Sequence, residues 1–256
     1  MMKTSNRGAD TGQRRLTARS VLASTLLGAD PPELPVAHLV QLSSLFGINE
    51  NRARVALSRM VASGEAATDG AGRYRLSGHL LERQRRQNAS RAGRTRRWRG
   101  DWHMVVVTTT GSAPEVRNHR RNALVFARLS ELREGVWLRP DNLDAAIPQD
   151  LGPDITGLSV RPERPDELVG QLWDTAAWAE QARHLGDQLN ALPPRDWTDL
   201  APGFVLSASV LRHFQADPLL PPELLAPDWP GQNLRARYDD WDARYRQVLA
   251  EWTPPS

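Results

Sequence analysis

The 256-residue sequence predicts a multidomain α+β protein, and three observations indicate this class. Residues 17–80 contain three stretches with helical apolar spacing, followed by a turn between two short strand-like segments. Residues 101–173 alternate strands with helices, and residues 174–256 are helical with proline-rich joints. Hydrophobic residues make up 40% of the chain, enough to build packed cores. The order of elements predicts an N-terminal winged helix-turn-helix domain, a central ferredoxin-like domain and a C-terminal helical domain.

Three helices are expected in the N-terminal domain, over residues 17–28, 36–46 and roughly 50–63. The third begins after Asn49, a favoured capping residue, and ends before Gly64, which suits the left-handed position after a helix. Helix, loop, helix, glycine-containing turn and third helix is the helix-turn-helix order. In that arrangement the third helix is positioned to enter a DNA major groove.

The third helix has two chemically different faces. Its core face carries Ala53, Leu57, Met60 and Val61 within a sector of about 100°. The opposite face carries amide, hydroxyl, methyl and guanidinium groups, which can contact base edges and phosphates. Its candidate DNA-binding residues are Asn51, Val55, Ser58 and Arg59, flanked by Arg52 and Arg54. The alternative for this segment alone is a solvated amphipathic helix with ordinary surface arginines.

A hairpin is expected directly after this helix, within residues 65–77. Asp69 and Gly70 indicate a tight turn between two short strands. Arg73 and Arg75 lie two positions apart on the returning strand and therefore share one face. We expect this hairpin to be the wing of the domain, with both arginines against the DNA backbone or in the minor groove.

Charge is distributed unevenly along the chain. Residues 1–100 contain 18 Lys and Arg against 7 Asp and Glu, a net of +11, whereas residues 101–256 contain 15 against 23, a net of −8. A basic module joined to an acidic one suits binding to a polyanion. Residues 81–100 hold eight arginines and one acid, and we expect a basic linker near phosphate there. Residues 1–16 are polar and are expected to form a disordered arm.

The middle and last parts of the chain have their own element order. We expect a strand over 102–108, a helix over 114–132, strands over 136–140 and 155–160, and a helix over 166–173. This succession is that of a ferredoxin-like fold or a fragment of one. The domain over 174–256 is expected to consist of helices and to serve effector binding and dimerisation. Asp239, Asp240 and Asp242 are expected on the solvated face of its last helix.

Several classes of function find no support in the sequence. Cysteine is absent, which excludes disulfides and thiolate sites and fits a cytoplasmic protein. The N-terminal apolar run is too short for a signal peptide, and no run of about 18 apolar residues could span a membrane. The six histidines lack metal-site spacing, and no nucleotide-binding or nucleophile motif occurs. We therefore expect no metal, no cofactor and no enzymatic activity.

Four pieces of the sequence together resemble the PaaX-type repressors of phenylacetate catabolism, and the resemblance covers nearly the whole chain from Thr17 onward. They are FGINENRARVALSRMVASG (46–64) with the RYRLS strand after it, the W-x-G-x-W element at Trp98, Gly100 and Trp102, EGVWLRP (134–140), and DPLLPPELLAPDWPG (217–231). The resemblance implies the same three-domain architecture. It also implies binding of operator DNA as a dimer and release by an aryl-CoA thioester, phenylacetyl-CoA in the best-known case.

The sequence thus predicts a sequence-specific DNA-binding transcriptional regulator that acts as a homodimeric repressor and is released by an aryl- or acyl-CoA thioester. The resemblance assigns DNA reading to the helix around Arg52–Arg59 and to Arg73 and Arg75. Arg212 and His213 lie beside an aromatic residue and are candidates for binding the effector, with core or interface packing as the alternative. The alternative function is a winged-helix protein-interaction or RNA-binding module without a small-molecule ligand.

Overall fold

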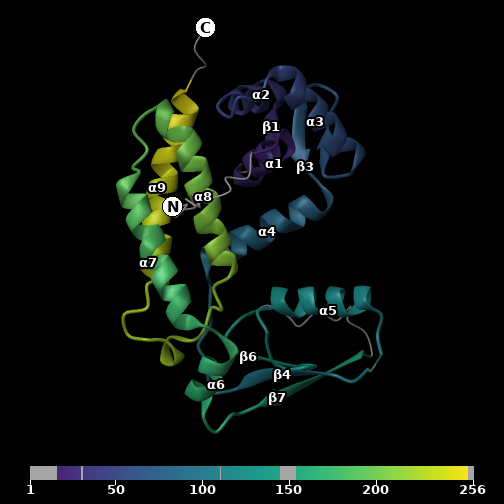
Figure 1. Ribbon diagram of the computed structural model, residues 1–256, viewed down its shortest axis with the longest axis vertical. Coiled ribbons are helices and arrows are strands. Elements are labelled where there is room, and N and C mark those ends of the chain that lie inside the picture. Colours follow the sequence, from purple (N-terminus) through teal and green to yellow (C-terminus); the bar gives the residue numbers. More distant parts are fainter. Residues whose placement is uncertain (1–15, 30, 110, 145–153, 253–256) are drawn as a thin grey trace, which may run out of the picture. The chain divides into compact units, whose positions relative to one another are not determined.

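The computed structural model describes residues 16–29, 31–109, 111–144 and 154–252. The arm predicted over residues 1–16 lies outside this part, except for its last residue. The chain divides into two units, one of residues 1–84 with 253–256 and one of residues 85–252. We call them unit 1 and unit 2 and describe each by itself (Figure 1). Helices combined with two small sheets confirm the expected mixed α+β class.

Unit 1 contains the three helices that the sequence predicts, followed by a hairpin. Its elements are α1 (Ala18–Gly28), β1 (Glu33–Pro35), α2 (Val36–Ser44), α3 (Glu50–Ala62), β2 (Ala66–Thr68), β3 (Arg73–Leu76) and the beginning of α4 (Gly78–Ala92). Thr17 caps α1 through a capping box with Ser20, and the Asn49 side chain accepts a hydrogen bond from the Arg52 backbone at the start of α3. Capping thus sets the start of both helices.

Strand β1 was not expected from the sequence. Glu33 and Leu34 pair with Arg75 and Tyr74 of β3, so the sheet has the order β1-β3-β2. The prolines around this segment predicted only a loop, but an edge strand tolerates proline because its outer side needs no ladder hydrogen bond. Pairing with a strand about 40 residues later along the chain is a tertiary contact. Local sequence patterns do not reveal such a contact.

The core of unit 1 lies between the three helices and the hairpin. Leu22, Leu26, Leu39 and Leu57 are completely buried there. Leu76 of β3 joins the same cluster and attaches the hairpin to the helices. Burial of a leucine side chain contributes roughly 1.5–3 kcal/mol relative to exposure, so this cluster holds α3 in place.

Unit 2 contains a four-stranded antiparallel sheet and the remaining helices. Its elements are the end of α4, β4 (Trp102–Val107), α5 (Pro114–Phe126), β5 (Ser130–Arg133), β6 (Val136–Pro140), β7 (Ile155–Val160), α6 (Pro165–Leu172), α7 (Thr175–Ala191), α8 (Leu200–Gln215) and α9 (Gly231–Glu251). The sheet order is β5-β6-β4-β7. Helix α6 follows the last strand, and the described residues between β6 and β7 contain no α-helix.

One predicted helix is too long. The helix expected over 114–132 ends at Phe126, and Ser130–Arg133 forms strand β5 against β6. Helical apolar spacing continues past the break because Ala127 and Leu129 are buried in the same core as Leu124. Between them, Arg128 has a φ of 64°, a left-handed conformation that ends the helix. The apolar pattern alone therefore did not mark the boundary.

Two cores lie on the two faces of the sheet. On one face, Val105 and Trp137 pack with Leu124 of α5. On the other, Trp102 and Leu138 pack with Leu172 of α6. Residues adjacent along a strand point to opposite faces, and Trp137 and Leu138 of β6 therefore enter different cores. This explains why every residue of β6 is buried.

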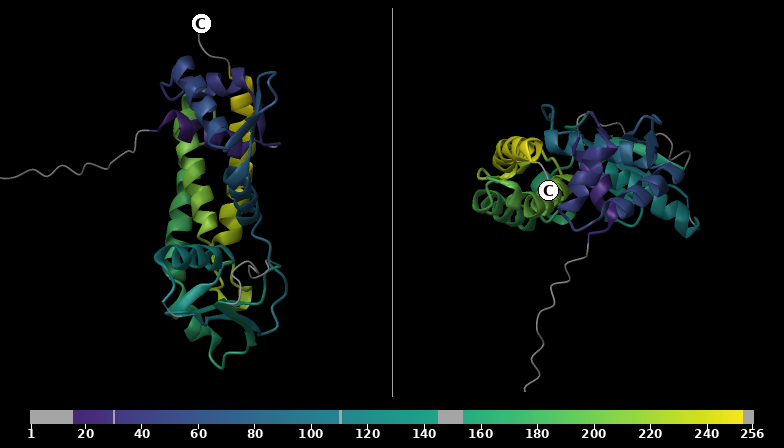
Figure 2. Two further views of the ribbon diagram at one scale, coloured as in Figure 1. Left: turned by 90° about the vertical axis from the view of Figure 1, so that its right-hand side faces the viewer. Right: turned by 90° about the horizontal axis from the view of Figure 1, so that it is seen from above.

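Helices α7, α8 and α9 run alongside one another (Figure 2). A Cβ on Gly203 of α8 would lie 2.7 Å from the Tyr245 ring of α9, so glycine permits this close approach. The Tyr245 hydroxyl donates to the Leu200 carbonyl at 2.9 Å, and Trp241 Nε1 donates to the Leu192 carbonyl at 2.6 Å. No helix within the described ranges has the length and apolarity required to cross a membrane.

Candidate nucleic-acid interface

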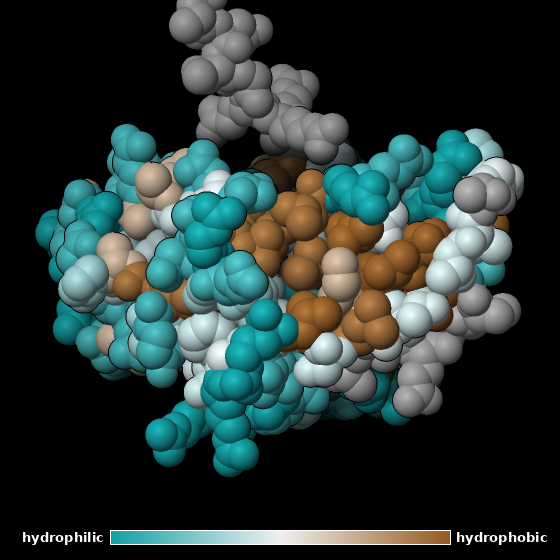
Figure 3. Space-filling view, turned by 90° about the horizontal axis from the view of Figure 1, so that it is seen from below, coloured by the Kyte–Doolittle hydropathy of each residue, from teal (hydrophilic) through white to brown (hydrophobic). Residues whose placement is uncertain are grey.

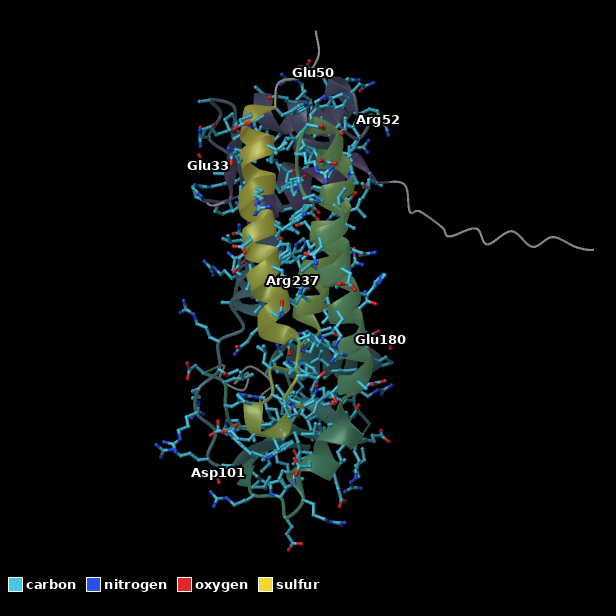
Figure 4. All side chains as sticks on the ribbon, turned by 90° about the vertical axis from the view of Figure 1, so that its left-hand side faces the viewer. Glu33, Glu50, Arg52, Asp101, Glu180 and Arg237 are labelled. Carbon is cyan, nitrogen blue, oxygen red and sulfur yellow. The ribbon has the colours of Figure 1, made fainter. Side chains whose placement is uncertain are left out.

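Helix α3 turns one face to the core of unit 1 and the other to solvent. Ala53, Leu57 and Met60 are buried, as the helical spacing predicts. The six residues expected on the outer face, Asn51, Arg52, Arg54, Val55, Ser58 and Arg59, are all exposed. Figure 4 shows Arg52 at the surface of unit 1. The structure thus presents the six candidate residues together on one accessible helix surface.

The arginines of this surface differ in their partners. Arg54 Nε lies 2.7 Å from Glu50 Oε1 one turn earlier, and Arg73 of β3 forms an ion pair with Glu33 of β1. Arg52, Arg59 and Arg75 have no ion-pair partner among the residues that the structure describes. Their guanidinium groups are therefore available to an external anion, whereas those of Arg54 and Arg73 are partly neutralised.

The hairpin projects its two arginines from one face. Arg73 and Arg75 are exposed, whereas Leu76 at the end of β3 is buried in the core of unit 1. The Asp69 carboxylate closes the turn by accepting hydrogen bonds from the backbone N–H groups of Ala71 at 2.8 Å and Arg73 at 3.0 Å. These donors, that of Arg73 above all, lower the pKa of Asp69 below its ordinary value. The turn is thus held by an ionised side chain.

An ion pair fixes the segment between α3 and the hairpin. Glu65 is buried, and Arg19 of α1 donates from Nε to its Oε2 at 2.8 Å and from a second nitrogen to Oε1. The hydrogen bond from Arg19 lowers the pKa of Glu65 below its ordinary value. His79 Nε2 lies 3.6 Å from the same carboxylate. Helix α1 is thereby tied to the base of the hairpin.

Glu65 makes unit 1 sensitive to acid. Because its pKa is lowered in the folded state, its stabilising contribution is present above pH 4.5 and is lost as the pH falls through the lowered value. Glu65→Gln is expected to cost about 1 kcal/mol of unfolding free energy at pH 7 and to flatten the decline below pH 4.5. Urea unfolding at a series of pH values checks this. Parallel pH profiles for variant and wild type would contradict it.

The basic stretch over 81–100 is largely helical, because α4 extends to Ala92. Two of its eight arginines are bound within unit 2. Arg91 pairs with Asp239 and Asp242 at 2.7 and 2.8 Å, and Arg96 pairs with Asp141. The remaining exposed arginines without an ion-pair partner in the described part of the chain are Arg83, Arg85, Arg94, Arg97 and Arg99. Phosphate binding by this stretch stays a prediction for these five.

Asp239 and Asp240 of α9 are exposed, as expected for a solvated face, but Asp242 differs. Asp242 is buried and binds both Arg91 and Arg246, the latter at 3.0 Å. The sequence did not predict the burial of Asp242, because an acidic run on a helix ordinarily indicates an exposed face. The contact with Arg91 of α4 shows it.

The two effector candidates occupy different environments in unit 2. Arg212 is exposed in the last turn of α8. The His213 ring stacks on Trp178 with centroids 4.3 Å apart, and Trp178 stacks in turn on Trp229 at 4.6 Å. Burial lowers the pKa of His213, which favours the neutral ring. The structure thus brings His213 into an aromatic stack without Arg212, and effector binding by this pair stays a prediction.

A buried charged network in unit 2 was missed at the sequence level. Asp217 is buried and lies 2.9 Å from Arg235 Nη2. Arg128 donates to the Asp217 carbonyl at 2.7 Å and to Ser90 Oγ at 2.6 Å, and Arg235 donates to the Ser90 carbonyl at 3.1 Å. Burial lowers the pKa of Arg128. Arg128 and Leu219 both have positive φ and lie in or next to this network. The network connects α4, the end of α8 and α9.

Comparison with known proteins identifies the family. Residues 17–80 match a family described as PaaX-like protein, and residues 95–152 match the PaaX protein central Cas2-like domain. The solved structure of the uncharacterized protein Rv0674 from Mycobacterium tuberculosis matches with 44% sequence identity and a TM-score of 0.74, covering 92% of this chain and 98% of that chain. The chain belongs to the PaaX-type family. No curated protein matches.

Membership of the PaaX-type family confirms the resemblance recognised in the sequence. It makes this PaaX-type chain a transcriptional regulator. The match over 17–80 contains the exposed surface of α3 and the hairpin arginines described above.

Proposed function

We propose that this PaaX-type regulator binds operator DNA sequence-specifically through α3 and the β2–β3 hairpin, which act as the recognition helix and wing of a winged helix. The observation that carries the proposal is the exposed face of α3. Asn51, Ser58 and Arg59 supply the amide, hydroxyl and guanidinium groups that bind base edges, and Val55 supplies methyl groups for thymine. The apolar residues Leu57 and Met60 of α3 lie in the core of unit 1. On the outer face, the ion pair that the structure describes is that of Arg54 with Glu50 within the helix itself.

The arginines of this surface are proposed to contact different parts of the DNA. Arg59 faces bases, while Arg52 and Arg75 have free guanidinium groups suited to phosphates on either side. Arg54 and Arg73 contribute less because each already binds a glutamate. Arg75 lies opposite Ala67 in β2 and Glu33 in β1, and its side chain is exposed.

The regulator is proposed to act as a homodimeric repressor without catalytic activity. Two copies related by a two-fold axis would place their α3 helices in successive major grooves, roughly 34 Å apart. An aryl- or acyl-CoA thioester, phenylacetyl-CoA being the first to test, would release it by binding the free protein more tightly than the DNA complex. Arg212 and His213 are the first positions to mutate for that response.

Binding to a duplex fragment of its own promoter tests the proposal. Fluorescence anisotropy is expected to show affinity that falls linearly with salt concentration on a double-logarithmic plot. Arg75→Ala should reduce the magnitude of that slope by about 0.9, since one phosphate contact is lost, and Arg73→Ala should reduce it less.

Duplex RNA of the same sequence is the control. Its deep, narrow major groove does not admit a helix, so binding should be far weaker than to DNA. Equal binding to RNA, or salt-independent binding to DNA, would overturn the proposal in favour of an RNA-binding or protein-interaction module. Release by phenylacetyl-CoA and not by phenylacetate would identify a thioester effector.

A further inference from the structure

Strand β7 is an edge strand of the sheet in unit 2, and no described residue pairs with its outer side. Its ladder partner in the described structure is β4 on one side, with Ile155 opposite Val107 and Val160 opposite Trp102. The four central residues, Thr156 to Ser159, are all exposed. The outer edge of this strand therefore offers backbone N–H and C=O groups that another strand can bind.

The two edges of this sheet are built differently. Strand β5, at the opposite edge, carries Glu131 and Arg133 and has a register shift between them, and both features disfavour pairing with a further strand. Strand β7 has the sequence ITGLSV, with no charge, no proline and no register shift against β4. Edge strands normally carry such protection. Of the two edge strands, only β7 lacks this protection, which indicates that its edge binds a partner strand.

Apolar surface adjoins the β7 edge. The Leu158 side chain is 46% exposed and shares its face of the sheet with Met104 and Val106 of β4, which are half-buried. Figure 3 shows apolar side chains gathered on the side of unit 2 where the sheet lies. A partner strand at this edge would therefore gain apolar contacts in addition to backbone hydrogen bonds.

We propose that β7 pairs antiparallel with β7 of a second copy of this chain, joining two four-stranded sheets into one across a two-fold axis. This inference rests on the homodimer of the proposed function and assigns its interface. Symmetry restricts the register. A two-fold axis perpendicular to the sheet pairs the central residue with itself, and the centre of Ile155–Val160 is Gly157 or Leu158.

The charges at the ends of β7 favour a second copy as the partner. Asp154 precedes the strand and Arg161 follows it. Antiparallel pairing brings the Asp154 end of each copy beside the Arg161 end of the other, so opposite charges meet at both ends of the ladder. Each group already has one partner and keeps part of its surface exposed. Arg120 lies 3.7 Å from the Asp154 carboxylate, which is 32% exposed, and the Arg161 guanidinium donates to Asp101 at 2.7 and 3.1 Å while its side chain stays 66% exposed. A parallel pair would instead bring like charges together.

Sedimentation velocity of the full chain over a range of concentrations tests the interface. Leu158→Lys places like charges at the proposed axis and should weaken dimerisation about tenfold or more. Leu132→Lys is the matched control, because Leu132 is 39% exposed on the opposite edge strand of the same sheet. We expect it to dimerise like wild type. Equal association of both variants, or a wild-type monomer at every concentration, would overturn the proposal.

Cysteine cross-linking gives an independent readout that does not require weakened association. The chain has no cysteine, and a Cβ at Gly157 meets nothing within 4 Å. Gly157→Cys or Leu158→Cys, whichever lies at the axis, should form a disulfide-linked dimer on oxidation, and Leu132→Cys should not. Cross-linking through none of the three, or through Leu132→Cys alone, would contradict the proposed edge.

These measurements separate the interface from the function. If the Leu158→Lys variant remains dimeric and wild type binds the promoter duplex, the interface assignment fails and the proposed function stands. If dimerisation follows the expected pattern but no duplex is bound, the proposed function fails and the interface stands.

Discussion

The Asp217→Asn variant is expected to lose about 3 to 5 kcal/mol of unfolding free energy, because it removes the buried carboxylate that pairs with the largely buried Arg235 guanidinium. The Asp217 side chain is 3% exposed and that of Arg235 is 13% exposed. Asparagine keeps the shape and the acceptor for the Leu219 N–H, which Asp217 binds at 2.9 Å. The loss of unfolding free energy therefore reports the removal of the Asp217 charge and not a change in side-chain volume.

Chemical unfolding followed by circular dichroism provides the measurement for Asp217→Asn. Asp239→Asn is the matched control, since Asp239 pairs with Arg91 at 2.7 Å but is 57% exposed. Exposed pairs contribute about 0.2 to 1 kcal/mol, so the control should stay within that range. Equal losses in the two variants would show that burial does not govern this network.

Arg59→Ala is expected to cost about 1 to 3 kcal/mol of operator affinity, because a guanidinium group that contacts a base is lost. Discrimination at a single base position should relax with it. Arg54→Ala on the same helix is the control. Its guanidinium is held by Glu50 at 2.7 Å, so its removal should cost less than about 1 kcal/mol.

Anisotropy titrations with the operator and with a non-operator duplex measure the effect of Arg59→Ala. The variant should unfold almost as wild type does, since the Arg59 side chain is exposed and, among the described residues, contributes a favourable charge in the last turn of α3 and no ion pair. Unchanged operator affinity would remove Arg59 from the recognition surface. A loss equal for both duplexes would assign it to phosphate instead of a base.

The helices of unit 1 were predictable because their signals are local. Asn49 caps α3 from the adjacent position, and the spacing of Ala53, Leu57 and Met60 defines the buried face within four turns. The six candidate residues follow from that face by elimination. Strands 136–140 and 155–160 were equally predictable, because bounded apolar or β-branched runs are local patterns.

Boundaries and pairings that depend on distant residues were not predictable. Helix α5 ends at Phe126 although the apolar spacing continues, because Ser130–Arg133 gains a ladder with β6. Strand β1 exists because β3 pairs with it. Within the candidate surface, sequence spacing separated Arg59 from the flanking Arg52 and Arg54 but revealed no ion-pair partners. The pairing of Arg73 with Glu33 depends on the register of two strands.

The sequence by itself determined the family, the mixed α+β class, the basic N-terminal and acidic C-terminal parts, and the outer face of α3, since all of these depend on residue identity and short-range spacing. Only the tertiary structure decided which arginines lack an ion-pair partner among the described residues, that Asp242 and Asp217 are buried with arginine partners, and that β7 lies at an edge of the sheet. Those properties depend on what packs against each residue. Burial changes the free energy of a charge by several kcal/mol, and residues far apart in the chain provide it.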